Sequence, residues 1–316
     1  SIEGSAFGAG VAASSVLYLI LAMVMGIALY RGRLALWKAT LIFLPFLLGI
    51  IWLGPRLPQG ILEPLSGLSV KQWDGLLLLY CLVASVIPVW LLLQPRGYMG
   101  GWFLYLVIFI GLAGALCGGF GIEYPAINLS GLKSLANGKN IFPILFITIA
   151  CGACSGFHGI VSSGTTSKQV KKERDSIPIT YGAMLLEGLV AVLAIITVII
   201  LPKGSPLLKA DPNLIYAAGL SRSLGLFNIP YEAGLLFALL AFSTFVYDTL
   251  DVCTRLARYI FQELTGLSSK KGGLICGLAS VALPFVFLMA SKEKGYLAAW
   301  PLFGASNQLL ASIILL

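Results

Sequence analysis

The chain has 316 residues and a formal net charge of +8 at pH 7; 58% of its residues are hydrophobic and only 11% are charged. Soluble domains usually contain about 25% charged residues, so this composition excludes an ordinary soluble protein. Apolar runs of about 18 or more residues, the length that crosses about 30 Å of hydrocarbon, recur along the chain. We therefore predict an all-α polytopic membrane protein in which residues 1–316 form a single transmembrane domain.

The apolar runs, taken in chain order, predict about nine membrane-spanning helices. Their predicted bounds are 11–30, 34–54, 75–94, 101–119, 141–166, 179–201, 232–253, 273–290 and 296–316. The fifth run is long and irregular in composition, so we expect at least one discontinuous helix there.

Lysine and arginine are most densely clustered after the odd-numbered spans, which places those connections in the cytoplasm. The basic residues on that side are Arg31, Arg33, Lys38, Arg96, Lys168, Lys171, Lys172, Arg174, Arg255, Arg258, Lys270 and Lys271. The start of the chain then lies outside, although SIEGSAFGAG has neither the basic region nor the cleavage site of a signal peptide. We therefore expect an upstream membrane portion that was lost, is disordered or belongs to a separate chain.

The fifth predicted span contains the stretch CGACSGFHGIVSSGTTSKQ, in which residues 151–166 are rich in glycine, serine and threonine. Irregular backbone survives in a bilayer only where protein or water covers it. Close helix packing or a simple helix end would explain the composition. The functional interpretation is a helix broken near Ser155–Gly159 that presents N–H and C=O groups to a substrate. The candidate substrate-binding residues are Ser155, Gly156, His158, Gly159, Ser162, Ser163 and Thr165.

Two titratable residues inside predicted spans are candidates for proton exchange. His158 is the only histidine of the chain, and an imidazole exchanges protons near neutral pH. Glu187 lies within the apolar segment GAMLLEGLVAV, where an acid faces the bundle interior, is paired or takes up a proton. A structural histidine and a glutamate that braces two helices are the alternatives.

The segment FSTFVYDTLDVCTRLARY carries polar residues three or four positions apart, which share one face of a helix. Asp248 with the hydroxyls of Ser243 and Thr244 is a candidate site for a cation or a proton. Asp251 and Arg255 are expected to bond each other, either structurally or as a cytoplasmic gate. In the last span, Asn307 either joins two helices or contributes to the substrate cavity.

Motifs of enzymes and of cofactor sites are missing from the sequence. It contains no GxxxxGK[ST], HExxH, GxSxG or dinucleotide fingerprint. The CxxC of Cys151 and Cys154 has no second pair to complete a metal site, so we interpret both as packing residues. We therefore predict no catalytic residues, no cofactor and no metal. The positive charge belongs to the loops, so we expect no nucleic-acid partner.

Five segments together resemble the carbon starvation protein A (CstA) family: WDGLLLLYCLVASVIPVWLLLQPRGY, ITIACGACSGFHGIVSSGTTSKQ, YGAMLLEGLVAV, TLDVCTRLARYIFQEL and WPLFGASNQLLA. The resemblance implies a secondary transporter of the bacterial inner membrane, related to the amino acid–polyamine–organocation superfamily. It also implies an inverted-repeat fold with two discontinuous helices around a midplane site. The family normally has a longer N-terminal part that forms the other broken helix, and this chain lacks that part.

We therefore predict a secondary active transporter that takes up peptides and is driven by protons, with sodium as the alternative coupling ion. A symporter of pyruvate or another small carboxylate is the alternative, and a channel or an intramembrane enzyme are alternatives of another class. The expected partners are the substrate, the lipid bilayer and a segment or second chain that supplies the N-terminal helices.

Overall fold

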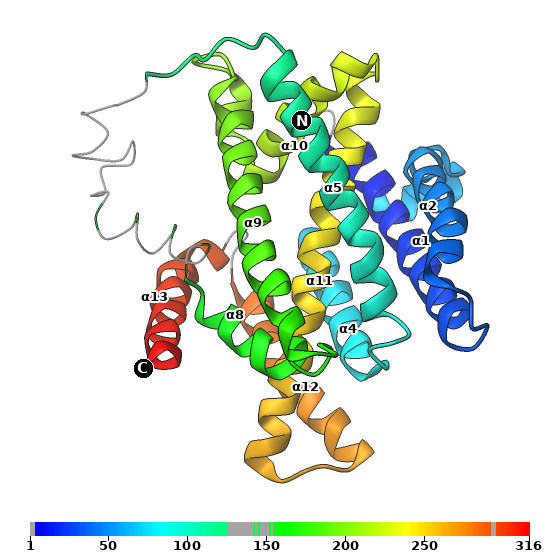
Figure 1. The fold of residues 1–316 in the computed structure, drawn as a ribbon, viewed down its shortest axis with the longest axis vertical. Helices are drawn as coiled ribbons and strands as arrows, with labels where there is room; N and C mark the ends of the chain where they lie inside the picture. The colour runs from blue at the N-terminus through cyan, green and yellow to red at the C-terminus, as the bar shows by residue number, and fades with distance from the viewer. Residues whose placement is uncertain are drawn as a thin grey trace. The chain divides into compact units, whose positions relative to one another are not determined.

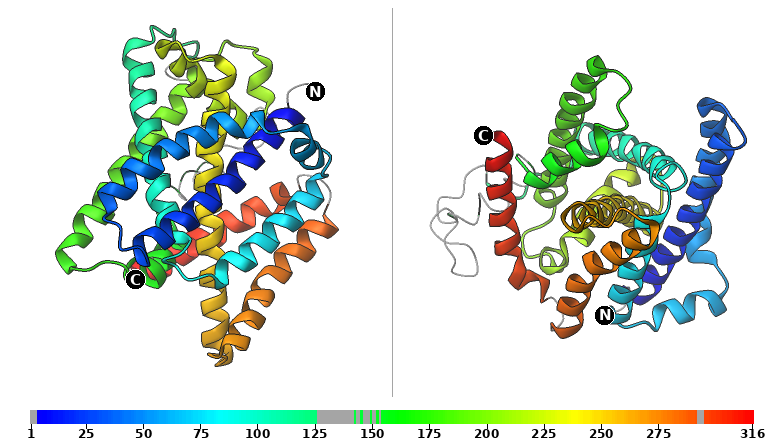
Figure 2. Two further views of the ribbon diagram at one scale, coloured as in Figure 1. Left: turned by 90° about the vertical axis from the view of Figure 1, so that its right-hand side faces the viewer. Right: turned by 90° about the horizontal axis from the view of Figure 1, so that it is seen from below.

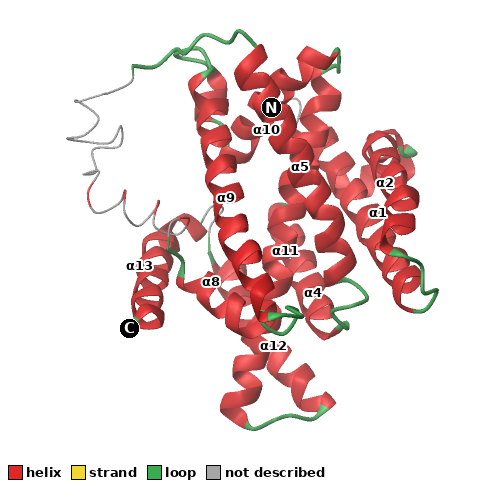
Figure 3. Cartoon of the chain, viewed as in Figure 1, coloured by secondary structure: helices red, strands yellow, loops and turns green. Residues whose placement is uncertain are grey.

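The computed structural model describes residues 4–125, 142, 145, 149, 152, 154–291 and 295–316. Within these residues the regular secondary structure is helical and no strand is present (Figure 3). Their contacts divide the chain into two compact units. Unit 1 is Ser1–Ser69, Ile87–Glu123 and Gly188–Asp251, and unit 2 is Val70–Val86, Tyr124–Glu187 and Val252–Leu316.

Six helices of the described residues are long and apolar enough to cross a membrane, as a multi-pass protein requires. They are Gly8–Tyr30, Leu36–Arg56, Leu93–Cys117, Glu173–Ile199, Tyr231–Thr265 and Lys270–Ala290. Many of their large apolar side chains are exposed, among them Leu41, Phe109 and Leu283. Lipid chains solvate such a surface, whereas water does not. The expected all-α polytopic class is thus confirmed. Residues 141, 143, 144, 146–148, 150, 151 and 153 of the predicted fifth span lie outside the described residues.

Unit 1 is built around one apolar core. Its helices are α1 (Gly4–Tyr30), α2 (Leu36–Leu53), α3 (Gln59–Ser66), α5 (Leu93–Cys117) and α10 (Pro212–Leu224), with 3-10 turns at Gly54–Arg56, Pro206–Lys209 and Gly225–Phe227. α1 and α2 run side by side, and α5 contacts both α1 and α10 (Figure 2). The rings of Tyr18 on α1 and Phe103 on α5 meet edge to face within this core, with centroids 6.0 Å apart.

Small residues allow the helices of unit 1 to approach closely. A methyl group at Gly114 of α5 would collide with the side chain of Ser223 on α10. In a membrane, where lipid is as apolar as leucine, such close backbone approach is a main source of helix association.

Unit 2 contains α4 (Val70–Val86), α8 (Gly156–Val161), α12 (Lys270–Ala290) and α13 (Tyr296–Leu315), whose labels are in Figure 1, with a π-helical turn at Ser162–Thr166 and a 3-10 turn at Glu173–Asp175. α4 packs on α12, and the Lys71 ammonium group on α4 donates to the carbonyl oxygen of Met289 at 2.8 Å. α8 packs on α13. Two long helices, α9 (Ser176–Ile199) and α11 (Tyr231–Thr265), contribute residues to both units.

Two predicted connections are wrong in this structure. The run 75–94 ends as a helix at Val86, and α5 begins at Leu93 instead of residue 101, so Arg96 lies in a helix and not in a loop. A proline is tolerated at Pro95 because the first N–H groups of a helix have no partner within it. α11 continues to Thr265, so Arg255 and Arg258 are helical as well.

Candidate functional site

The backbone is extended at Ser155, inside the stretch for which a broken helix was predicted, and the discontinuous membrane-spanning helix itself stays a prediction. Gly152 is helical, Cys154 lies in a bend, and Ser155 has extended backbone angles (φ −95°, ψ 124°) before α8 begins at Gly156. The Ser155 hydroxyl accepts a hydrogen bond from the His158 amide at 3.4 Å, as an N-cap residue does. The interruption is therefore a helix start with its own cap.

Asn307 on α13 holds this helix start in place. Its side-chain oxygen accepts hydrogen bonds from the Phe157 amide at 2.8 Å and the Ser155 hydroxyl at 3.2 Å. A methyl group at Gly156 would lie 2.5 Å from the Asn307 carbonyl oxygen and 2.6 Å from the Ala311 amide nitrogen, so only glycine fits there. Because the Phe157 amide requires the oxygen of the side chain, Nδ2 points away from it, buried and without a partner.

The hydroxyls of three further predicted residues in this segment bond to the backbone of the preceding turn. The hydroxyls of Ser162, Ser163 and Thr165 donate to backbone carbonyl oxygens of Gly159, Ile160 and Val161, at 2.8, 3.1 and 2.9 Å. His158 is exposed, and its ring contacts that of Phe157 with centroids 5.9 Å apart. Glu187 on α9 is also exposed.

A second set of predicted residues forms a buried polar cluster in unit 1. The Arg96 guanidinium group forms an ion pair with Asp251, and the two residues are 0% and 1% exposed. Arg96 also donates to the Thr244 carbonyl oxygen at 3.4 Å, while the Tyr18 hydroxyl donates to the Arg96 carbonyl oxygen at 2.7 Å. The ion pair thus joins α5 to α11 within apolar helices, and the Tyr18 hydroxyl joins α1 to α5.

The pair of Asp251 with Arg96 changes the predicted gate. Arg255 is 3% exposed and donates to the carbonyl oxygen of Ala84 on α4 at 2.6 Å. It therefore ties α11 to α4 within unit 2, while Asp251 belongs to unit 1. The gating role of Asp251 and Arg255 stays a prediction.

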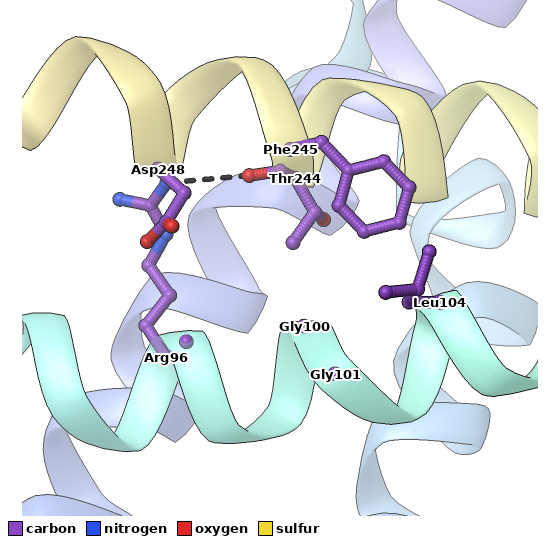
Figure 4. A pocket seen from close by; sticks show the side chains of 8 residues that line it. Arg96, Gly100, Gly101, Leu104, Thr244, Phe245 and Asp248 are labelled. Atoms are coloured by element: carbon purple, nitrogen blue, oxygen red, sulfur yellow. Dashed lines mark hydrogen bonds between the residues drawn. The ribbon is translucent and has the colours of Figure 1, made fainter. Parts of the chain in front are cut away.

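A cavity of about 210 Å³ lies between α5 and α11 beside this cluster. It is lined by Arg96, Gly97, Gly100, Gly101 and Leu104 of α5 and by Thr244, Phe245 and Asp248 of α11. Figure 4 shows Arg96 extending from α5 towards Asp248, with Gly100 opposite Thr244 and with Leu104 and Phe245 at the other end. The glycines leave this space open: a methyl group at Gly100 would lie 3.6 Å from Thr244 Cγ2 and 3.7 Å from the Tyr18 hydroxyl.

Asp248 is the chemically conspicuous group of the cavity. Its Oδ1 atom is buried and has no hydrogen-bond partner. A buried carboxylate oxygen without a partner is costly, so such a group takes up a proton or binds a positively charged group. The hydroxyl of Ser243, predicted to act beside it, donates to the Leu240 carbonyl oxygen at 2.9 Å, and its role stays a prediction.

The structure brings together Thr244, Asp248 and Asp251 as the sequence suggested, and it adds Arg96 and Tyr18, which sequence reasoning missed. An arginine directly before the apolar run that starts at Gly97 was the available signal for Arg96. Nothing in the sequence identified Tyr18 as a site residue, because a single tyrosine in an apolar helix is common. The described residues contain no group of three or more His, Cys, Asp or Glu that would hold a metal ion.

Comparisons with known proteins agree with the sequence motifs. The model of the family described as carbon starvation protein CstA matches residues 4–215 and 203–316. The peptide transporter CstA of Bacillus subtilis (strain 168) is 31% identical over 92% of this chain and 55% of its own length. The peptide transporter CstA of Helicobacter pylori (strain ATCC 700392 / 26695) is 32% identical over 75% of this chain and 43% of its own.

A relative with another printed substrate is also similar. The pyruvate/proton symporter BtsT of Escherichia coli (strain K12) is 28% identical over 75% of this chain and 44% of its own length. The chain spans about half the length of the curated relatives it matches. No solved structure matches it significantly.

Proposed function

This chain belongs to the carbon starvation protein CstA family, and on that premise we propose that it is part of a secondary active transporter that takes up peptides. Relatives named as peptide transporters support the substrate class. The relative named as a pyruvate/proton symporter supports a proton as the coupling ion and keeps pyruvate as the alternative substrate. The chain itself is a multi-pass protein of the bacterial inner membrane.

The observation that carries the proposal is the cavity beside the Arg96–Asp251 pair. Ionisable residues inside membrane-spanning helices are expensive to keep there and mark substrate or ion pathways. Here an ion pair, the Asp248 carboxylate and three glycines surround about 210 Å³ of space between two apolar helices. A protein that only needed stability would fill such a space with apolar side chains.

The helix start at Ser155 supports a transporter fold in the same proposal. Secondary transporters form their sites at discontinuous helices near the bilayer midplane, commonly within inverted repeats. We propose that the intact fold has about nine spans from this chain and that the interrupted segment contributes to the substrate site. The Asn307 Nδ2 donor, buried and without a partner, is available to an oxygen of the substrate there.

The coupling ion in this proposal is a proton, with sodium as the alternative. His158 and Glu187, both exposed in this structure, are the residues proposed to exchange the proton. Asp248 takes a positive charge, either the coupling ion or a cationic group of the substrate.

Transport is tested by uptake in right-side-out membrane vesicles that contain the intact protein. A labelled dipeptide and labelled pyruvate are each offered with and without a protonophore, and vesicles without the protein serve as the control. Accumulation above the external concentration that the protonophore abolishes supports the proposal. Equilibration without accumulation indicates a channel, and a chemically altered solute without accumulation indicates an enzyme; either result would refute it.

A further inference from the structure

Both hydroxyl groups beside the cavity in unit 1 already use their hydrogen-bond donor. The Thr244 hydroxyl donates to the Leu240 carbonyl oxygen at 2.9 Å, and the Tyr18 hydroxyl donates to the Arg96 carbonyl oxygen at 2.7 Å. The Arg96 guanidinium group is engaged with Asp251 and with the Thr244 carbonyl oxygen. What these hydroxyls still offer to a ligand are oxygen lone pairs.

Asp248 adds the strongest acceptor to this set. Its buried Oδ1 atom has no partner, and a carboxylate accepts hydrogen bonds without donating any. Arg96 and Asp251 neutralise each other, so the ionised Asp248 leaves the cluster with one net negative charge. A positively charged group with hydrogen-bond donors therefore complements the Asp248 carboxylate and the hydroxyl oxygens.

A primary ammonium group has this chemistry, since it carries one positive charge and three N–H donors. The cavity volume of about 210 Å³ limits how much of the ligand enters. Pockets that enclose a whole drug-sized ligand measure about 300–1,000 Å³, so this cavity accommodates one end of a longer molecule. Leu104 and Phe245 form an apolar wall of the cavity on the side away from Asp248.

We propose that this cavity binds the amino-terminal ammonium group of the peptide substrate, with the Asp248 carboxylate as its main partner and the Thr244 hydroxyl oxygen as a second acceptor. The inference rests on the proposed function and narrows it, because pyruvate has no ammonium group. It assigns Asp248 to the substrate and not to the coupling ion. Gly97 and Gly100 keep the space that the first residue of the peptide occupies.

The test is equilibrium binding to the purified intact protein in nanodiscs, without any ion gradient and in sodium-free buffer at one pH. The ligands are labelled alanyl-alanine, its N-acetylated form and pyruvate. The variants are Asp248→Asn, which removes the charge and keeps the shape, and Glu63→Gln, which removes an exposed carboxylate on α3 of the same unit. Asp248→Glu tests whether a carboxylate alone restores binding.

We expect N-acetylation to weaken binding to the wild-type protein by about 10- to 100-fold, as the loss of a charge-assisted hydrogen bond does. Asp248→Asn should weaken binding of the free dipeptide by a similar factor and leave binding of the acetylated dipeptide unchanged. Glu63→Gln should change neither affinity, and Asp248→Glu should recover part of the loss. The comparison of the two dipeptides on the wild-type protein holds even if Asp248→Asn does not fold.

Equal affinity for free and acetylated dipeptide would overturn the assignment, as would an Asp248→Asn variant that weakens both equally. A variant that binds the dipeptide normally but has a changed proton or sodium dependence of uptake would also overturn it. In that case Asp248 serves the coupling ion. Accumulation of pyruvate in vesicles without any dipeptide binding would overturn this inference and leave transport standing, whereas loss of all accumulation would overturn transport itself.

Discussion

The loss of one member of the Arg96–Asp251 pair should destabilise the protein more than the loss of both members together. The two residues are 0% and 1% exposed, so neither charge is solvated when its partner is removed. Removal of one partner from a buried ion pair typically costs about 3–5 kcal/mol in the free energy of unfolding. We expect this cost for Arg96→Met and for Asp251→Asn, and a cost for the double variant that is lower than the sum by about 2 kcal/mol or more.

The assay is the fraction of detergent-solubilised protein that stays monodisperse after heating, measured for the wild type, both single variants and the double variant. About 1 kcal/mol shifts the midpoint by roughly 2–4 °C in domains of 150–250 residues, so each single variant should lose roughly 6–20 °C. Lys203→Met, which removes an exposed lysine from a loop of unit 1, is the matched control and should shift the midpoint by no more than about 2 °C. Single variants that behave like this control, or a double variant whose loss equals the sum, would refute the role of the pair.

Three further predictions concern the interrupted segment. Gly156→Ala should lower the thermal midpoint by the equivalent of about 1–3 kcal/mol because the added methyl group meets backbone atoms of α13, whereas Gly182→Ala, with open space at its site, should not. Asn307→Ala should cost about 1–2 kcal/mol in the same assay because the Phe157 amide loses its acceptor, and Asn307→Asp, which keeps an acceptor, should cost less; equal losses would contradict the capping role. His158→Ala should slow proton-driven uptake in vesicles and change its pH profile, and uptake with the normal rate and profile would remove the proton role assigned to it.

The sequence by itself determined the class of the protein and the position of its main irregularity. Run length and composition decide whether a segment crosses a membrane, because each backbone group in lipid must be satisfied within its own helix. Local composition also indicates where the backbone is irregular. Glycine, serine and threonine gather around Ser155, and Ser155 has extended backbone angles and caps α8. Both properties depend on neighbours in the chain.

Only the tertiary structure decided which charged residues meet. Sequence spacing suggested Arg255, four residues later, as a partner of Asp251. The structure shows that Asp251 forms an ion pair with Arg96, which is 155 residues away in the chain. Arg96 itself looked like a loop residue beside Pro95 and Gly97, and its place in α5 follows from where the helix starts. A partner so distant in sequence is selected by how α5 packs against α11, and the free energy of that packing comes from many contacts that no local pattern contains.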